Sequence, residues 1–210
     1  MLCGNEAALV LLPWERLADR ARHYIGLDAR ESGDCVPDGL QVAADEIVLR
    51  GPAAARAIVS ARQAGSLLAC VQATGACAAM IEQTIDYLNT RVQFGKVLAT
   101  FQALQHRTVE MYVAYENLSG LVRRLVLRAN ASGAEHLLAD ARDVALARMY
   151  ATSGARSVAE AAIQLHGGMG MTWEMPVARL AMLALGGNVL YGSRDECFDW
   201  LTAQTMAAAA

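Results

Sequence analysis

Residues 91–96 read Arg-Val-Gln-Phe-Gly-Lys, and residues 101–106 read Phe-Gln-Ala-Leu-Gln-His. This stretch, here called the arginine corner (residues 91–106), separates two long segments with helical patterning. It places a basic side chain, an amide, an aromatic ring and a glycine together. Such a corner can bind the anionic end of a nucleotide-like cofactor, or it can simply turn the chain.

The segments on either side of the arginine corner predict long helices. No proline occurs between Pro52 and Pro176, and we expect helices over about 53–91, 101–130 and 134–165. A fourth helical segment begins near Glu174, with Pro176 in its first turn. The second helix has one face with 4-3 spacing, formed by Leu104, Thr108, Met111, Tyr115, Leu118, Val122 and Leu125. The third has a thinner apolar face, formed by Ala141, Val144, Ala151, Ala155, Val158 and Ala162. Together they predict a mainly α fold, an up-and-down four-helix bundle at residues 53–210.

The N-terminal residues 1–52 predict a short β-rich segment. Strands are expected at residues 7–12, 39–42 and 46–49, and the polar stretch 28–38 is expected to be turn-rich. Three short strands make a poor independent sheet, because isolated small sheets are marginal in water. We therefore expect residues 1–52 to be part of a larger β domain, or a sheet that a partner completes.

Composition excludes several classes of function. The net charge of -3 gives no electrostatic reason to expect nucleic acid binding. No run of about 18 uncharged apolar residues is present, which argues against a membrane span, and the first residues lack the basic region of a signal peptide. The five cysteines have no metal-ligand spacing and the four histidines form no ligand set. We expect free thiols, no metal, and a cytoplasmic location.

A second glycine-rich stretch follows the third predicted helix. Residues 164–174, here called the glycine corner, read Gln-Leu-His-Gly-Gly-Met-Gly-Met-Thr-Trp-Glu. Its three glycines let backbone N–H groups approach a ligand or another helix closely. Glycines alone also suit an ordinary turn between helices. The presence of both corners in one chain favours cofactor binding.

The two corners resemble the two signatures of the C-terminal domain of the acyl-CoA dehydrogenase family. The resemblance covers about residues 53–203, and more weakly residues 5–50 as the end of the family's central β domain. The family's N-terminal helical domain and the first half of its β domain have no counterpart in this sequence. The resemblance implies a C-terminal helical bundle and FAD-dependent α,β-dehydrogenation of an acyl-CoA thioester.

The resemblance also implies which residues hold the cofactor. In the family, the arginine corner reaches across a subunit interface to the ADP portion of a neighbour's FAD. Arg91 would pair with the diphosphate, because its planar guanidinium forms bidentate hydrogen bonds to phosphate. The other cofactor-binding residues implied in this way are Gln93, Phe94, Phe101, Gln102, Gln164, Gly167 and Gly168.

The catalytic base is where this sequence departs from the family. Most members carry a catalytic carboxylate at the position that Tyr191 occupies here, and a minority carry it on the first helix, at the position of Gly65. Neither residue is a carboxylate, and an unperturbed tyrosine pKa near about 10 makes Tyr191 a poor base. The arginine expected one turn after position 65 is also out of register, since Arg62 precedes it.

Three other acidic residues lie near these positions. Asp195 and Glu196 are either displaced bases or a solvated helix face, of which the second is the commoner arrangement. Glu174 is expected to lie at a helix N-terminus. The resemblance therefore leaves this chain without an expected catalytic residue.

Three functions remain open from the sequence. The first is a non-catalytic subunit that helps to bind the FAD of an acyl-CoA dehydrogenase-type partner, in a homo- or hetero-oligomer. Asymmetric pairs of this kind are known in the family among bacterial enzymes acting on steroid-derived CoA thioesters, and electron-transfer flavoprotein is the family's usual acceptor. The second is a flavin-free helical interaction module, and the third is a truncated piece of an ordinary dehydrogenase. The retained corners favour the first over the second, and the missing bases favour either over the third.

Overall fold

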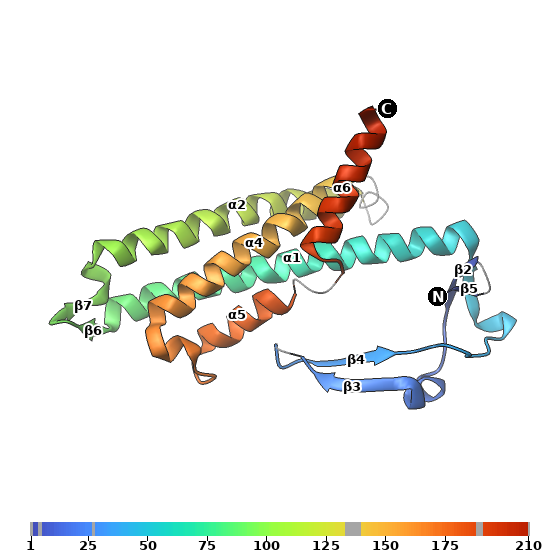
Figure 1. Cartoon of the computed structure of the whole chain (residues 1–210), viewed down its shortest axis with the longest axis horizontal. Helices are drawn as coiled ribbons and strands as arrows, with labels where there is room; N and C mark the ends of the chain where they lie inside the picture. Colours follow the sequence, from blue (N-terminus) through green and yellow to red (C-terminus); the bar gives the residue numbers. More distant parts are fainter. Residues whose placement is uncertain (1, 4–5, 27, 133–139, 188–190, 210) are drawn as a thin grey trace. The chain divides into compact units, whose positions relative to one another are not determined.

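The chain folds into a helical bundle preceded by short β-strands, as predicted (Figure 1). The computed structural model describes residues 2–3, 6–26, 28–132, 140–187 and 191–209. Its contacts divide it into two compact units, residues 1–62 and 63–210. The domain boundary expected at residue 52 stays a prediction.

Within the described residues, four helices make up the up-and-down bundle, and their arrangement can be followed in Figure 1. They are α1 (Gly51–Thr90), α2 (Gln102–Ser132), α4 (Ala141–His166) and α5 (Pro176–Gly186). Pro176 stands at the first turn of α5, where its missing N–H has no helical partner to lose. A further helix, α6 (Arg194–Ala209), packs against α4. The start expected for the third helix, at residue 134, lies outside the described residues.

Small apolar residues let the helices approach closely around two core clusters. The cluster nearer the arginine corner includes Met80 and Ile81 of α1, Met111 of α2, Val158 of α4 and Val177 of α5. The second cluster contains Leu67 and Cys70 of α1, Leu118 and Leu125 of α2, and Val144 of α4. Each fully buried Leu, Val or Met side chain contributes about 1.5–3 kcal/mol. These clusters hold the two ends of the bundle at fixed positions.

Helix α1 is long and apolar enough to cross a membrane by length and composition alone. More than half of its most apolar stretch is buried inside the structure, however. That is the pattern of a core helix, in agreement with the bundle.

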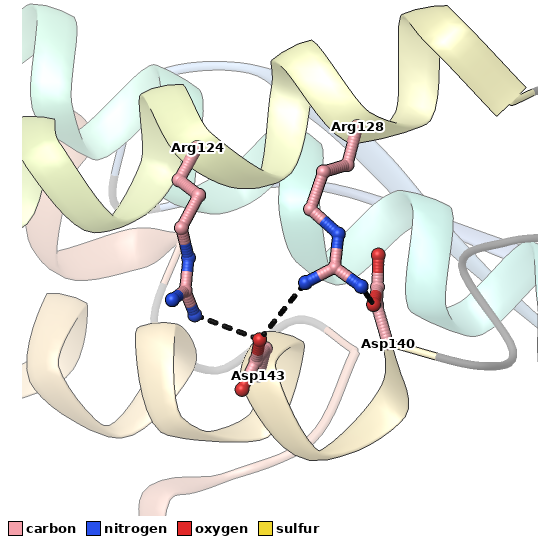
Figure 2. A network of polar contacts seen from close by, with 4 residues as sticks. All are labelled: Arg124, Arg128, Asp140 and Asp143. Carbon is pink, nitrogen blue, oxygen red and sulfur yellow. Dashed lines mark hydrogen bonds and ion pairs between the residues drawn. The ribbon is translucent and has the colours of Figure 1, made fainter.

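An ion-pair network joins the end of α2 to the start of α4 (Figure 2). Arg128 pairs with both Asp140 and Asp143, and Arg124 Nη2 lies 2.7 Å from Asp143 Oδ2. The Asp140 side chain is only 4% exposed, whereas that of Asp143 is 28% exposed. A carboxylate at a helix N-terminus is also favoured by the helix dipole. The network therefore ties the C-terminal part of α2 to the start of α4.

The described residues of the N-terminal unit form two small antiparallel sheets. Strands β1 (Leu2–Cys3), β2 (Glu6–Val10) and β5 (Ile47–Arg50) form one sheet in the order β1-β2-β5, which confirms the strands expected at 7–12 and 46–49. Strands β3 (Ala21–Ile25) and β4 (Glu31–Cys35) form the other.

Two sequence expectations for this unit are wrong. Residues 39–42 form no strand, and the stretch 28–38, expected to be turns, contains β4. The β3–β4 pair is almost entirely exposed, so neither strand needs the apolar alternation by which strands are recognised in a sequence. Backbone pairing in the register Ala21↔Cys35 to Ile25↔Glu31 holds it instead.

Candidate functional site

The arginine corner is a tight two-residue β-hairpin. Strands β6 (Val92–Gln93) and β7 (Lys96–Val97) pair antiparallel, with Phe94 and Gly95 at the tip. Both tip residues have positive φ, 55° and 79°, as a type I′ turn requires. Glycine adopts this conformation readily, but for a bulky residue it costs on the order of 1 kcal/mol. The aromatic residue at position 94 is therefore held in a strained backbone conformation.

The rings of the hairpin form a small exposed cluster. The Phe94 side chain is 86% exposed and meets the Phe101 ring edge-on, with centroids 6.2 Å apart. Lys96 Nζ lies 4.3 Å from the centroid of the same Phe101 ring, within cation–π range. The hairpin tip thus presents an aromatic surface with a positive charge beside it.

Arg91 has a fixed backbone and a projecting side chain. Its N–H donates to the carbonyl of Tyr87 at 2.9 Å, and its own carbonyl accepts from Leu98 N at 2.9 Å. The side chain is exposed and makes no hydrogen bond or ion pair within the described part of the chain. Gln93 and Gln102 are also exposed. The corner therefore offers a guanidinium and two amides to a ligand.

The glycine corner begins where α4 ends. After His166 the chain forms a short 3-10 turn over Gly167–Met171. Gly167 has φ 62° and ψ -145°, a conformation that is essentially restricted to glycine. Gly170 is required by packing, because a Cβ there would lie 2.5 Å from the Ile163 carbonyl oxygen.

Gly167 and Gly168 have a different environment from Gly170. A Cβ at either position would meet nothing within 4 Å, and both residues are exposed. Packing within the chain therefore gives no reason for glycine at position 168. The exposed backbone at these two residues is open to close approach by a ligand, and the exposed side chain of Gln164 precedes them.

The two corners lie at the same end of the bundle (Figure 1). The ring of His166, at the end of α4, stacks on Tyr87, in the last turn of α1, with centroids 4.5 Å apart. His166 Nδ1 bonds the Ala162 carbonyl at 2.9 Å, and the residue is only 2% exposed. It is thus a packing residue, and it joins the glycine corner to the last turn of α1, whose Tyr87 carbonyl accepts the Arg91 N–H.

The two expected base positions are also brought together. A Cβ at Gly65 of α1 would lie 2.5 Å from Cε1 and 2.6 Å from Cδ1 of Tyr191, so the tyrosine ring lies directly on the glycine. Tyr191 has φ 62° and is 50% exposed. The structure therefore places a phenol against bare helix backbone where the family resemblance leads one to expect a carboxylate.

The neighbouring acidic residues lie at or near the starts of helices. Glu196 accepts a hydrogen bond from Ser193 N at 2.7 Å, while Ser193 Oγ accepts one from Glu196 N at 3.1 Å. This reciprocal pair is a capping box at the start of α6. Asp195 is exposed, and Glu174 lies just before α5. The described residues contain no group of acidic, histidine and cysteine side chains that could hold a metal ion.

Arg148 of α4 is a residue that the sequence interpretation missed. It is fully buried, and its guanidinium donates to the carbonyls of Gly187 at 2.5 Å and Gly192 at 3.4 Å. It also interacts with the thiol of Cys70. Burial raises the pKa of Cys70 to about 11, although the positive charge of Arg148 acts in the opposite direction. Arg148 therefore connects α4 and α1 to the backbone on both sides of Tyr191.

The comparison with protein families agrees with this arrangement. Residues 54–196 match the model of the acyl-CoA dehydrogenase C-terminal domain. Among curated relatives, acyl-CoA dehydrogenase IpdE2 of Mycolicibacterium smegmatis is 30% identical over 139 residues, which are 66% of this chain and 42% of the relative. The mitochondrial long-chain specific acyl-CoA dehydrogenase of Mus musculus is 25% identical over 189 residues, 90% of this chain and 43% of the relative.

Solved structures show the same fold. A variant of the Tcur3481–Tcur3483 steroid ACAD is 25% identical, with a TM-score of 0.72, over 90% of this chain and 49% of that one. The ChsE4–ChsE5 complex from Mycobacterium tuberculosis is 22% identical, with a TM-score of 0.76, over 89% and 48% respectively. The chain thus spans about half the length of the relatives it matches. Since the family model covers more than half of the sequence, the chain belongs to the acyl-CoA dehydrogenase family.

Proposed function

We propose that this chain is an acyl-CoA dehydrogenase-type subunit that helps a partner subunit to bind FAD and that supplies no catalytic base. One observation carries the proposal. The end of the bundle that bears the arginine and glycine corners presents an arginine, amides and open backbone, while the two base positions hold Gly65 and Tyr191. In this proposal the chain keeps the residues for cofactor binding and lacks the residue for proton abstraction.

The residues of the two corners fit the ADP portion of FAD. Arg91 projects a guanidinium from a fixed backbone, which suits a diphosphate because two parallel hydrogen bonds can form. Gly167 and Gly168 expose backbone without a neighbouring atom in the way, which suits close approach of an anionic group. Gln93, Gln102 and Gln164 are exposed and can donate or accept hydrogen bonds at the same end.

The strained hairpin tip supports the same role. Phe94 is the most exposed of the large apolar side chains that the structure describes, and it occupies a position where Asn, Asp or Gly is preferred. A strained and exposed aromatic residue is costly in the isolated chain. The cost is offset if the ring packs against a cofactor or a second subunit. The cationic Lys96 beside it adds favourable charge for phosphate.

The base positions limit what this chain can do alone. FAD, when bound, supplies the acceptor for the hydride from the substrate β-carbon. Removal of the α-proton needs a positioned carboxylate whose pKa matches the task. Gly65 has no side chain, Tyr191 is a phenol, and Glu196 is engaged in the capping box. The carboxylate must therefore come from the partner.

The substrate class follows from the similar proteins by analogy only. One similar structure is a steroid ACAD, and another is a complex of two different chains. These support a heteromer that acts on a CoA thioester of a bulky acid. The same proposal includes a cytoplasmic location, from the absence of cysteine pairing patterns in the sequence, and electron-transfer flavoprotein as the acceptor, from family resemblance.

Co-expression with a full-length acyl-CoA dehydrogenase-type subunit tests the proposal. We expect a stable complex by size-exclusion chromatography with light scattering, and a flavin absorption spectrum that the chain lacks when it is purified alone. The full-length subunit expressed alone is the control, and it should hold less flavin than the complex. A chain that stays monomeric and colourless with every such subunit would instead be a flavin-free module.

A further inference from the structure

Position 191 has a second unusual feature besides the missing carboxylate. The backbone of Tyr191 has φ 62°, and the next residue, Gly192, has φ 113°. A positive φ at a bulky residue is strained, and it persists only where the surrounding structure imposes it. The contacts that impose it can be identified. One is the helix surface at Gly65, and the other is the guanidinium of Arg148.

Arg148 is placed to fix the backbone around Tyr191. Its Nη2 donates to the Gly187 carbonyl at 2.5 Å, and Nη2 and Nε each lie 3.4 Å from the Gly192 carbonyl oxygen. The planar guanidinium carries its donors in a rigid fork, so it can hold two carbonyls at a fixed separation. One of these carbonyls belongs to Gly187, the residue that caps the C-terminus of α5, and the other belongs to the residue after Tyr191. Arg148 is completely buried, so loss of its guanidinium would leave the Gly187 carbonyl without this partner in a site that excludes water, which is costly.

Gly65 is placed to receive the ring. It is buried in α1 although it has no side chain, because the ring of Tyr191 covers it. A glutamate at position 65 would bring its Cβ within 2.5 Å of the ring, a distance that atoms not bonded to one another do not adopt. The ring at 191 and a side chain at 65 therefore exclude each other.

We infer that Arg148 is a positioning residue that holds the Tyr191 ring on Gly65, so that the place of the catalytic carboxylate in this chain is filled from within. The inference deepens the proposed function and rests on it in one respect, the assignment of positions 65 and 191 as the places where relatives carry the base. It explains the two missing bases as one coupled packing arrangement. A carboxylate restored at position 65 alone would collide with the ring, so the ring would have to leave its place on the helix.

Fluorine NMR of the full chain labelled with 3-fluorotyrosine tests the positioning role. The chain has six tyrosines, and the Tyr191→Phe variant assigns the resonance of residue 191. In Arg148→Met, we expect this resonance to move to the position of free 3-fluorotyrosine and to sharpen. The resonances of Tyr24, Tyr87 and Tyr112, which are distant in sequence from position 148, should stay. Arg148→Lys, which keeps donors at this site, should return the resonance toward the wild-type position.

Val158→Ala is the matched control. Val158 is also completely buried in α4, so its truncation destabilises the same helix without touching Gly187 or Gly192. An unchanged 191 resonance in folded Arg148→Met would overturn the inference, and so would an equal movement in Val158→Ala. If Arg148→Met does not fold, Arg148→Lys tests the positioning role, and Gly65→Ala tests the contact that Arg148 is inferred to hold, because its Cβ must displace the ring. A 191 resonance unmoved in Gly65→Ala would refute the contact itself.

The measurement needs neither flavin nor a partner. A failure here would leave the role of the two corners in flavin binding untouched. Conversely, loss of the heteromer proposal would leave the Arg148–Tyr191 arrangement standing as a property of the fold.

Discussion

The ring of Tyr191 lies on the backbone of Gly65, so close that a Cβ at Gly65 would come within 2.5 Å of ring atom Cε1. The two residues are far apart in the sequence, and they occupy the two positions at which the acyl-CoA dehydrogenase resemblance places a base. The contact is possible only because residue 65 has no side chain.

The effect of a Gly65 substitution on the free energy of unfolding should therefore depend on the residue at position 191, and it should be opposite in sign when the tyrosine ring is removed. In the wild-type background, Gly65→Ala should lower the free energy of unfolding by about 1–3 kcal/mol, because it overpacks the contact. In a Tyr191→Ala background it should raise that free energy by about 0.5–1 kcal/mol, because alanine is the better helix former. Urea unfolding of the four proteins measures the cycle. Equal effects of Gly65→Ala in both backgrounds would contradict the contact.

Replacement of Phe94 at the hairpin tip should raise the stability of the chain and weaken its cofactor binding. Phe94→Asn relieves the strain of positive φ, since Asn-Gly is a preferred pair in a type I′ turn. It loses only an exposed ring contact. We expect thermal unfolding to shift upward by about 2 °C, corresponding to roughly 0.5–1 kcal/mol, while the complex retains less flavin. Phe94→Leu, which keeps the strain and removes the aromatic ring, is the control and should not gain stability.

Much of the helical fold could be predicted from the sequence, because periodicity and proline placement are local signals. Apolar residues of α2 recur at 4-3 spacing, and Pro176 marks the first turn of α5. The β3–β4 pair could not be found in this way, because its side chains are exposed and its pairing is carried by backbone atoms. Hydrophobic patterns in a sequence reflect side-chain burial, and the β3–β4 pair buries almost no side chains.

Within the candidate site, the exposed corners could be identified from residue types, but the buried contacts could not. The apolar face expected for the third helix includes Val144 and Ala151. Helical spacing places Arg148 between them on the same face, although the expected face does not include it. A charged residue at a core position is the signal that could have identified Arg148. In a sequence with seventeen arginines, one more arginine on a helix does not stand out. The contact of Tyr191 with Gly65 depends on tertiary packing between distant segments, for which a single sequence carries no signal.

The ion pairs between α2 and α4 should differ strongly in their contributions. Asp140→Asn should lower the free energy of unfolding by about 1–2 kcal/mol, because its carboxylate is buried and bonded to Arg128. Asp143→Asn is the matched control, and it should cost less than about 1 kcal/mol because its pairs with Arg124 and Arg128 are more exposed. Urea unfolding at low salt measures both. An equal loss in the two variants would show that burial does not govern the network.

The buried thiols should make the fold sensitive to alkaline pH. Burial raises the pKa of Cys70 to about 11 and that of Cys77 to about 12, from about 9 in the unfolded chain. Above pH 9 the unfolded chain releases these protons first and is favoured. Stability should thus be retained below pH 9 and fall by up to about 1.4 kcal/mol per pH unit per thiol toward pH 11.

Urea unfolding at pH 8, 9 and 10 measures this loss. The Cys70→Ala, Cys77→Ala double variant should show a shallower decline above pH 9 than the wild-type chain. Cys35→Ala is the control, because Cys35 is exposed and its removal should leave the slope unchanged. A double variant with the wild-type slope would assign the alkaline loss to other groups.

The flavin content of the complex with Arg91→Ala tests the central claim most directly. Arg123→Ala is the control, since Arg123 is also an exposed arginine but lies on α2, away from both corners. Loss of charge-assisted hydrogen bonds to a diphosphate should raise the dissociation constant for FAD by about ten- to a hundredfold. The account predicts that the Arg91→Ala complex assembles but loses flavin on gel filtration, while the Arg123→Ala complex keeps it. Equal flavin content in the wild-type, Arg91→Ala and Arg123→Ala complexes would contradict the account.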